Sequence, residues 1–82
     1  MPTLHVRLFA ILREHAGQDR LELDVPAGTT TAQLKELVRT AAPGLGPYMD
    51  ATRVAVNLAF APPEQVLAPG DDVALIPPVG GG

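Results

Sequence analysis

Residues 30–41 read Thr-Thr-Ala-Gln-Leu-Lys-Glu-Leu-Val-Arg-Thr-Ala, and this stretch carries the clearest helix signal in the chain. Thr30 can cap the first turn with its hydroxyl, while Gln33 can reach back to the Thr30 backbone in a capping box. The apolar residues that follow recur at helical spacing, at Leu34, Leu37, Val38 and Ala41. The pattern therefore predicts one helix that lays an apolar stripe on a sheet and ends at Pro43-Gly44.

The segments around this helix alternate apolar and polar residues with the period of half-buried strands. They are Thr3–Ala10, Leu21–Val25, Arg53–Leu58 and Asp71–Ile76. The short connection between the first two predicts an antiparallel hairpin, and the helix is expected to cross over to a parallel strand. Ala59–Ala61 is expected to extend the third strand or to form a short edge strand. Short helical turns are predicted over Ile11–Ala16 and around Pro47–Asp50.

The period of two also separates core positions from exposed ones. The residues expected in the core around the third strand and the loop after it are Val54, Val56, Leu58, Val66 and Leu67. Phe9 and Ile76 instead fall at solvent-facing positions of the first and last strands. Apolar side chains at such positions need a separate explanation.

The order of the predicted elements is β-β-α-β-(short β)-β. It predicts an α+β fold with the ubiquitin-like β-grasp architecture, in which a mixed sheet of four to five strands carries one main helix on one face. A chain of 82 residues has room for one small domain, and an apolar share of 46% fits a chain that folds around a core. The domain is expected to span residues 1–76, followed by a flexible C-terminal tail at residues 77–82.

The composition excludes several classes of function. The chain has no cysteine, which removes disulfides, thiolate nucleophiles, iron–sulfur clusters and the usual structural zinc sites. His5 and His15 are the only histidines, and no metal site is expected. The formal charge is −3 and Lys35 is the only lysine, so neither a nucleic-acid nor a membrane surface is expected.

Sequence motifs narrow the function further. The chain has no phosphate-binding loop, no dinucleotide-binding glycine motif and no metalloprotease motif, so no self-sufficient active site is predicted. It also shows neither an apolar stretch long enough for a membrane span nor a signal peptide. The expected location is therefore cytoplasmic.

The last residues differ from the rest because Leu75-Ile-Pro-Pro-Val-Gly-Gly-Gly82 holds no charged side chain. Pro77-Pro78 would stiffen the exit from the last strand, and Val79 offers one apolar grip. No side chain would clash in a narrow channel, since the chain finishes in Gly80, Gly81 and Gly82. When extended, residues 77–82 span about 20 Å, which is enough to enter another protein's active site. The alternative is a frayed, inert tail.

Three segments together form a pattern that covers nearly the whole chain. They are Phe9-Ala-x-x-Arg13-Glu14-x-x-Gly17, Val56-Asn57 and Leu67-x-x-Gly70-Asp71-x-Val73-x-x-x-Pro77-Pro78-Val79-x-Gly81-Gly82. The pattern resembles the MoaD-like small subunit of molybdopterin synthase, in the ubiquitin-like MoaD/ThiS sulfur-carrier family. Gly80 departs from the family pattern, because a serine or threonine is more usual there.

This resemblance implies a sulfur-donating subunit that is not itself catalytic and binds no cofactor. An E1-like, MoeB-like adenylyltransferase would use ATP to adenylate Gly82, whose carboxylate would then become a thiocarboxylate. The tail would next enter the large, MoaE-like subunit of molybdopterin synthase. There the sulfur would pass to cyclic pyranopterin monophosphate, in molybdenum cofactor biosynthesis.

The solvent-facing apolar residues predict where a partner docks. Phe9 and Ile76 lie on strands that a β-grasp sheet can place side by side, and Phe60 extends the patch. The patch is expected to continue into the tail through Pro77, Pro78 and Val79. The alternative is that the two aromatic rings cap the core. Arg13 and Arg53 are either a polar rim or ordinary solvated charges.

Three other functions stay open at this point. A ThiS-like carrier that serves thiamine, cysteine or tRNA thiolation would share the Gly-Gly end. A ubiquitin-like protein modifier would be joined through Gly82 to lysines of its targets. A plain interaction domain would keep the fold and carry an inert tail.

Overall fold

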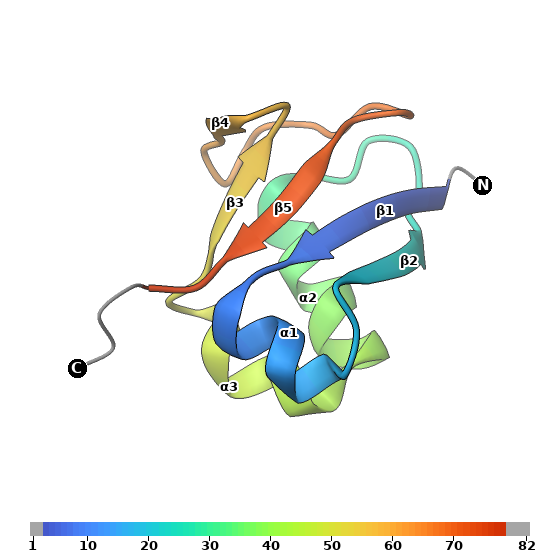
Figure 1. Ribbon diagram of the computed structural model, residues 1–82. Helices are drawn as coiled ribbons and strands as arrows, with labels where there is room; N and C mark the ends of the chain where they lie inside the picture. Colours follow the sequence, from blue (N-terminus) through green and yellow to red (C-terminus); the bar gives the residue numbers. More distant parts are fainter. Residues whose placement is uncertain (1–2, 79–82) are drawn as a thin grey trace.

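A computed structural model describes residues 3–78, in which a five-stranded sheet carries helices on one face (Figure 1). The strands are β1 (Thr3–Leu8), β2 (Arg20–Asp24), β3 (Arg53–Val56), β4 (Ala59–Phe60) and β5 (Val73–Ile76). The helices are α1 (Ala10–Ala16), α2 (Thr31–Ala41) and α3 (Gly46–Met49), with the 3-10 turn η1 at Pro43–Leu45. The predicted α+β, ubiquitin-like β-grasp with one main helix is confirmed. None of the helices in this part of the chain has the length and apolar character that a membrane crossing requires.

The sheet has the order β2-β1-β5-β3-β4. β1 and β2 pair antiparallel, as predicted, and β5 pairs parallel with β1. β3 runs in the same direction as β2, but its own neighbours, β5 and β4, are both antiparallel to it. The loop between β4 and β5 thus returns the chain so that β5 lies between β1 and β3, at the centre of the sheet.

The main helix begins as its sequence predicts. The Gln33 N–H donates to Thr30 Oγ1 at 3.3 Å, and Gln33 Oε1 accepts from the Thr30 N–H at 3.0 Å, so the capping box is complete. Leu34 and Val38 are fully buried. Ala41 was expected in the apolar stripe but is exposed, because it lies in the last turn, where residues of η1 and α3 close the core instead.

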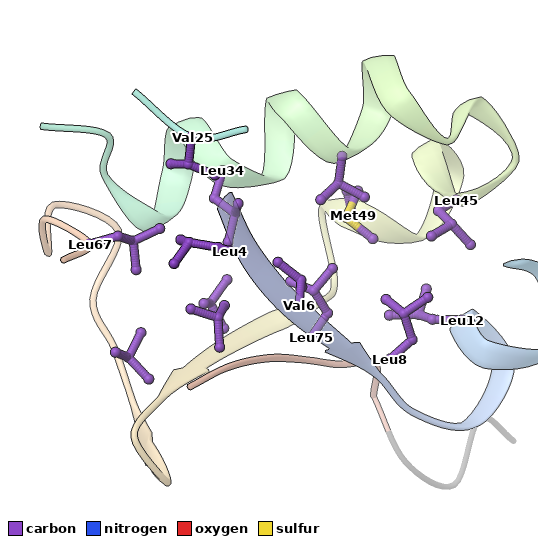
Figure 2. Packing of buried hydrophobic residues seen from close by; sticks show 14 residues of the cluster. Leu4, Val6, Leu8, Leu12, Val25, Leu34, Leu45, Met49, Leu67 and Leu75 are labelled. Atoms are coloured by element: carbon purple, nitrogen blue, oxygen red, sulfur yellow. The ribbon is translucent and has the colours of Figure 1, made fainter. Parts of the chain in front are cut away.

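The core fills the space between α2 and the inner face of the sheet (Figure 2). β1 contributes Leu4, Val6 and Leu8 to it, and β5 contributes Val73 and Leu75. At the end of the core next to α1 and α3, three further side chains close it, which are Leu12 of α1, Leu45 of η1 and Met49 of α3. This packing leaves the opposite face of the sheet without a covering layer.

Two strands end earlier than their sequence patterns predict, and both stop where the backbone becomes left-handed. β1 stops at Leu8 because Ala10, with φ of 52°, turns the chain into α1. β3 stops at Val56 because Asn57 and Leu58, with φ of 52° and 71°, form a two-residue hairpin turn to β4. The prediction that Leu58 lies in the core is therefore wrong, and its side chain is 85% exposed.

The loop between β4 and β5 corrects two further predictions. Leu67 is buried, as expected, but the prediction that Val66 also lies in the core is wrong, since Val66 is 57% exposed. Neighbouring side chains of an extended segment point to opposite sides, so these two residues do not both face the core. The last strand begins at Val73 and not at Asp71. The Asp71 N–H instead donates to the Ala68 carbonyl and closes a turn through Gly70, which has φ of 85°.

Candidate functional site on the outer face of the sheet

Strand register aligns one row of residues across the outer face, the face turned away from α2. Arg7 of β1 pairs with Ala74 of β5, Ala74 pairs with Ala55 of β3, and Ala55 pairs with Phe60 of β4. The middle of the row thus consists of two methyl groups between two long side chains. Ala55 and Ala74 are only 7% and 5% exposed, because larger neighbours rise around them.

These two alanines form the floor of a hollow of about 210 Å³, here called the outer-face hollow. Its walls are the side chains of Arg7, Phe9, Leu58, Phe60, Asp72 and Ile76. The structure therefore brings Phe9, Phe60 and Ile76, which the sequence assigns to one partner-binding patch, around a common depression. Their role in binding a partner stays a prediction.

The walls of the hollow are largely apolar and accessible. Phe9 is 40% exposed, Phe60 is 54% exposed, and Leu58 protrudes from the β3–β4 turn. Phe9 reaches this face because β1 ends one residue before it and the left-handed Ala10 then turns the chain away. Exposed apolar side chains gathered around a depression mark a protein-binding surface more often than singly scattered ones do.

Charged side chains frame the apolar walls. Arg7 Nη2 donates to Asp72 Oδ2 at 2.9 Å, and the Arg7 guanidinium lies 5.8 Å from the centre of the Phe9 ring. The Arg53 guanidinium lies 3.9 Å from the centre of the Phe60 ring. Each such exposed contact contributes only about 0–1 kcal/mol, so these pairs orient the rings more than they stabilise the fold.

The two arginines proposed as a polar rim lie in different places. Arg53 stacks on Phe60, at the border of the outer-face hollow. Arg13 belongs to α1, has an exposed side chain and does not line the hollow. The structure thus supports a rim position for Arg53 and leaves Arg13 as a solvated charge.

The tail leaves the body beside the hollow. Ile76 lines the hollow and is the last residue of β5, so residue 77 follows it directly. Pro77 is buried and Pro78 is exposed. The predictions for Val79, Gly80, Gly81 and Gly82 concern positions outside the described residues.

Asn57 fixes the β3–β4 turn to the start of β5. Its Nδ2 donates to Asp71 Oδ1 at 3.1 Å, and its Oδ1 accepts from the Asp72 N–H at 3.0 Å. These bonds hold the turn that carries Leu58 against the Asp71–Asp72 segment, and both Leu58 and Asp72 line the hollow. Sequence reasoning placed Asn57 within a family pattern but missed this positioning role.

The similarity of the chain to a known family covers almost all of it. The ThiS family model matches residues 6–82. The chain belongs to the ThiS family. The resemblance to MoaD/ThiS sulfur carriers seen in the sequence is therefore confirmed.

Relatives of this ThiS-family chain carry a common name. The molybdopterin synthase sulfur carrier subunit of Mycobacterium tuberculosis is 35% identical over 83 residues, covering 100% of both chains. The molybdopterin synthase sulfur carrier subunit of Drosophila yakuba is 37% identical over 82 residues, covering 96% of this chain and 90% of its own.

Solved structures similar to this chain include a small archaeal modifier protein and subunits of molybdopterin-converting factor. SAMP1 from Haloferax volcanii has a TM-score of 0.84 at 31% identity, covering 98% of this chain and 99% of its own. Putative molybdopterin converting factor, subunit 1, from Pyrococcus furiosus has a TM-score of 0.83 at 26% identity, with 96% and 100% covered. A complex of subunits 1 and 2 of molybdopterin-converting factor from Helicobacter pylori contains a chain with a TM-score of 0.69 at 21% identity, covering 98% and 99%; this likeness shows the fold.

Proposed function

We propose that the chain is the sulfur-carrier small subunit of molybdopterin synthase and acts in molybdenum cofactor biosynthesis. Its similarity to the sulfur carrier subunit of Mycobacterium tuberculosis over 100% of both chains carries the proposal. The position of the hollow supports it. A partner seated on Phe9 and Ile76 has the start of the tail, at Pro77, directly beside it.

The reacting group in this proposal is the carboxylate of Gly82. On an E1-like, MoeB-like adenylyltransferase, a carboxylate oxygen attacks the α-phosphate of ATP, pyrophosphate leaves, and an acyl-adenylate forms. A sulfide donor then attacks the acyl carbon and AMP leaves, so that Gly82 ends in a thiocarboxylate. ATP belongs to the activating enzyme, and the carrier binds no cofactor of its own.

Sulfur transfer follows in the large, MoaE-like subunit. The thiocarboxylate sulfur attacks a carbon of cyclic pyranopterin monophosphate, a carbon–sulfur bond forms, and the carbon–oxygen bond at that carbon breaks with departure of its oxygen. Water then cleaves the acyl–sulfur bond, which leaves the sulfur on the substrate and regenerates the Gly82 carboxylate. Two such transfers supply both sulfurs of the dithiolene. This chain contributes no acid or base to these steps: its outer-face hollow docks the partner, and its tail delivers the sulfur.

Reconstitution tests the proposal. The thiocarboxylate form of the chain, mixed with the large subunit of molybdopterin synthase from the same genome, is expected to convert cyclic pyranopterin monophosphate to molybdopterin. A variant that lacks Gly82 is expected to fold and to give no product. Co-purification of a thiazole synthase or a cysteine synthase, with no large subunit, would contradict the assignment. The cytoplasmic location stays a prediction that cell fractionation tests.

A second candidate function is protein modification, which the similarity to SAMP1, a small archaeal modifier protein, favours. In that reaction the ε-amine of a target lysine displaces AMP from Gly82 and forms an isopeptide bond. Chains of the protein itself are disfavoured, because Nζ of Lys35, the only lysine, donates to the Thr52 carbonyl at 3.1 Å and is partly buried. Mass spectrometry of cell extracts for Gly82 on lysines of other proteins distinguishes a modifier from a carrier.

A further inference from the structure

A second depression, of about 360 Å³, lies between α2 and the β3–β4 hairpin. Lys35 reaches it from α2, and Arg53 reaches it from the start of β3. Phe60 lines both this depression and the outer-face hollow, so the two are continuous through one side chain. The second depression is here called the Lys35–Arg53 groove.

The groove is cationic on an acidic protein. The chain has 9 acidic residues against 6 lysines and arginines, yet neither an aspartate nor a glutamate lines the groove. Within residues 3–78, Lys35 and Arg53 form no ion pair, whereas Arg7, Arg20 and Arg39 each lie within ion-pair distance of a carboxylate. Two positive charges therefore face this groove without a counter-charge from the described part of the chain.

The neutral donors of the groove are already used. Thr31 Oγ1 donates to the Pro62 carbonyl at 2.6 Å. Thr52 Oγ1 donates to the Tyr48 carbonyl at 2.7 Å. The backbone N–H groups of Thr31 and Ala32 donate to carbonyls of the loop that follows β4. None of these groups is available to a ligand.

The donors that remain belong to the two cations. Lys35 donates one of its three N–H groups to the Thr52 carbonyl. This bond positions the ammonium and leaves two N–H groups free to donate. Arg53 donates no side-chain hydrogen bond within the described residues, and its guanidinium lies over the Phe60 ring, 3.9 Å from the ring centre. Both side chains line the same groove, so both can contribute to binding a negative charge there, and the guanidinium of an arginine can donate two parallel hydrogen bonds to one carboxylate.

We infer that the Lys35–Arg53 groove binds an acidic segment, bearing aspartate or glutamate carboxylates, of the protein that docks on the outer-face hollow. Phe60 lines both the outer-face hollow and the groove, so a protein that contacts the Phe60 ring also reaches the groove. For this reason we expect the groove to be occupied by side chains of that protein. The identity of that partner rests on the proposed function. The groove thus adds positive charge, unpaired within residues 3–78, to a docking surface whose other charged side chains, Arg7 and Asp72, are paired with each other.

Titration calorimetry with the purified large subunit from the same genome, at low and high ionic strength, tests this inference. Replacing both cations, by Lys35→Gln with Arg53→Gln, is expected to weaken binding about tenfold at low salt and to remove most of its salt dependence. The charge-conserving pair Lys35→Arg with Arg53→Lys is expected to keep the salt dependence. Arg20→Gln, at the opposite edge of the sheet on β2, is the control and is expected to change neither quantity.

The outcomes separate this inference from the proposed function. If Phe60→Ala weakens binding while the double Gln variant keeps the affinity and salt dependence of the unmodified chain, the inference is overturned and the proposed function stands. If the unmodified chain does not bind the large subunit, both are overturned. If only the double Gln variant loses the salt dependence, the groove is the site of charge recognition.

Discussion

Ala55 of β3 and Ala74 of β5 face each other in register on the outer side of the sheet, and both are almost inaccessible although no helix covers them. Their methyl groups form a floor that two phenylalanines and an isoleucine surround. A larger residue at either position would fill the depression from below. The depth of the outer-face hollow is thus set by its two smallest side chains.

A larger side chain on the floor of the hollow is expected to affect binding of the partner and not the stability of the fold. Ala55→Leu is expected to keep the fold, because the hollow above it is open, and to weaken binding of the large subunit about tenfold or more. Thermal unfolding and calorimetric titration measure the two effects. Ala41→Leu, an exposed substitution on α2, is the control and is expected to leave the affinity unchanged. An unchanged affinity in Ala55→Leu would show that the partner does not use the hollow.

The left-handed backbone conformation of Leu58 is expected to lower the stability of the fold, while its side chain is expected to favour binding of the partner. Leu58→Gly is expected to stabilise the fold by about 1 kcal/mol, because glycine adopts a φ of 71° without the strain of a side chain. The same change removes an apolar wall and is expected to weaken binding of the partner. Urea unfolding gives the free energy of unfolding of each variant.

Val66→Gly is the matched control for that change. Val66 is also exposed, but its φ is not positive, so glycine there is expected to destabilise the fold by about 0.5–1 kcal/mol. If Leu58→Gly destabilises the fold as Val66→Gly does, the turn stores no strain. If it stabilises the fold without affecting binding, Leu58 is not part of the docking surface.

Sequence patterns predict most of this fold because the informative signals are local. The capping box at Thr30 and the alternation of Leu4, Val6 and Leu8 depend only on neighbours in the chain. Leu58 could not be placed in this way. Its apolar character continues the alternation of β3, and the turn is revealed only by the structure, in the left-handed backbone of Asn57 and Leu58 and in the bonds of Asn57 to Asp71 and Asp72.

The capping box is expected to contribute measurably to stability. Thr30→Ala removes the acceptor of the Gln33 N–H and is expected to lower the free energy of unfolding by about 1 kcal/mol. Thr40→Ala, at an exposed position late in α2, is the control and is expected to cost less, because alanine has the higher helix propensity. Urea unfolding measures the free energy of unfolding of each variant. Equal decreases in the two variants would show that the Thr30 capping bond does not stabilise the fold.

The core is expected to tolerate truncation poorly. Leu34 is fully buried under the sheet, so Leu34→Ala is expected to cost about 2–5 kcal/mol, a large part of the about 5–15 kcal/mol that stabilises a typical domain. Ile11→Ala, at a side chain that is 36% exposed, is expected to cost distinctly less. A small loss in Leu34→Ala, measured by thermal unfolding, would contradict the packing described for α2.

The candidate site was predictable only in part. Parity along each strand identifies Phe9 and Ile76 as outward-facing, because that requires only the period of two. The row that joins Arg7, Ala74 and Ala55 depends on the pairing of β5 with both β1 and β3. That pairing joins segments far apart in the chain, and no short motif encodes its register.

The mass of the intact chain is the sharpest test of whether Gly82 carries sulfur. After incubation with the E1-like adenylyltransferase, ATP and a sulfide donor, one oxygen of the Gly82 carboxylate is expected to be replaced by sulfur. Omission of ATP or deletion of Gly82 is expected to prevent the replacement. A sulfur carrier that is known to react, incubated under the same conditions, serves as the positive control. An unchanged mass under conditions in which that control reacts would show that the chain is not a sulfur carrier.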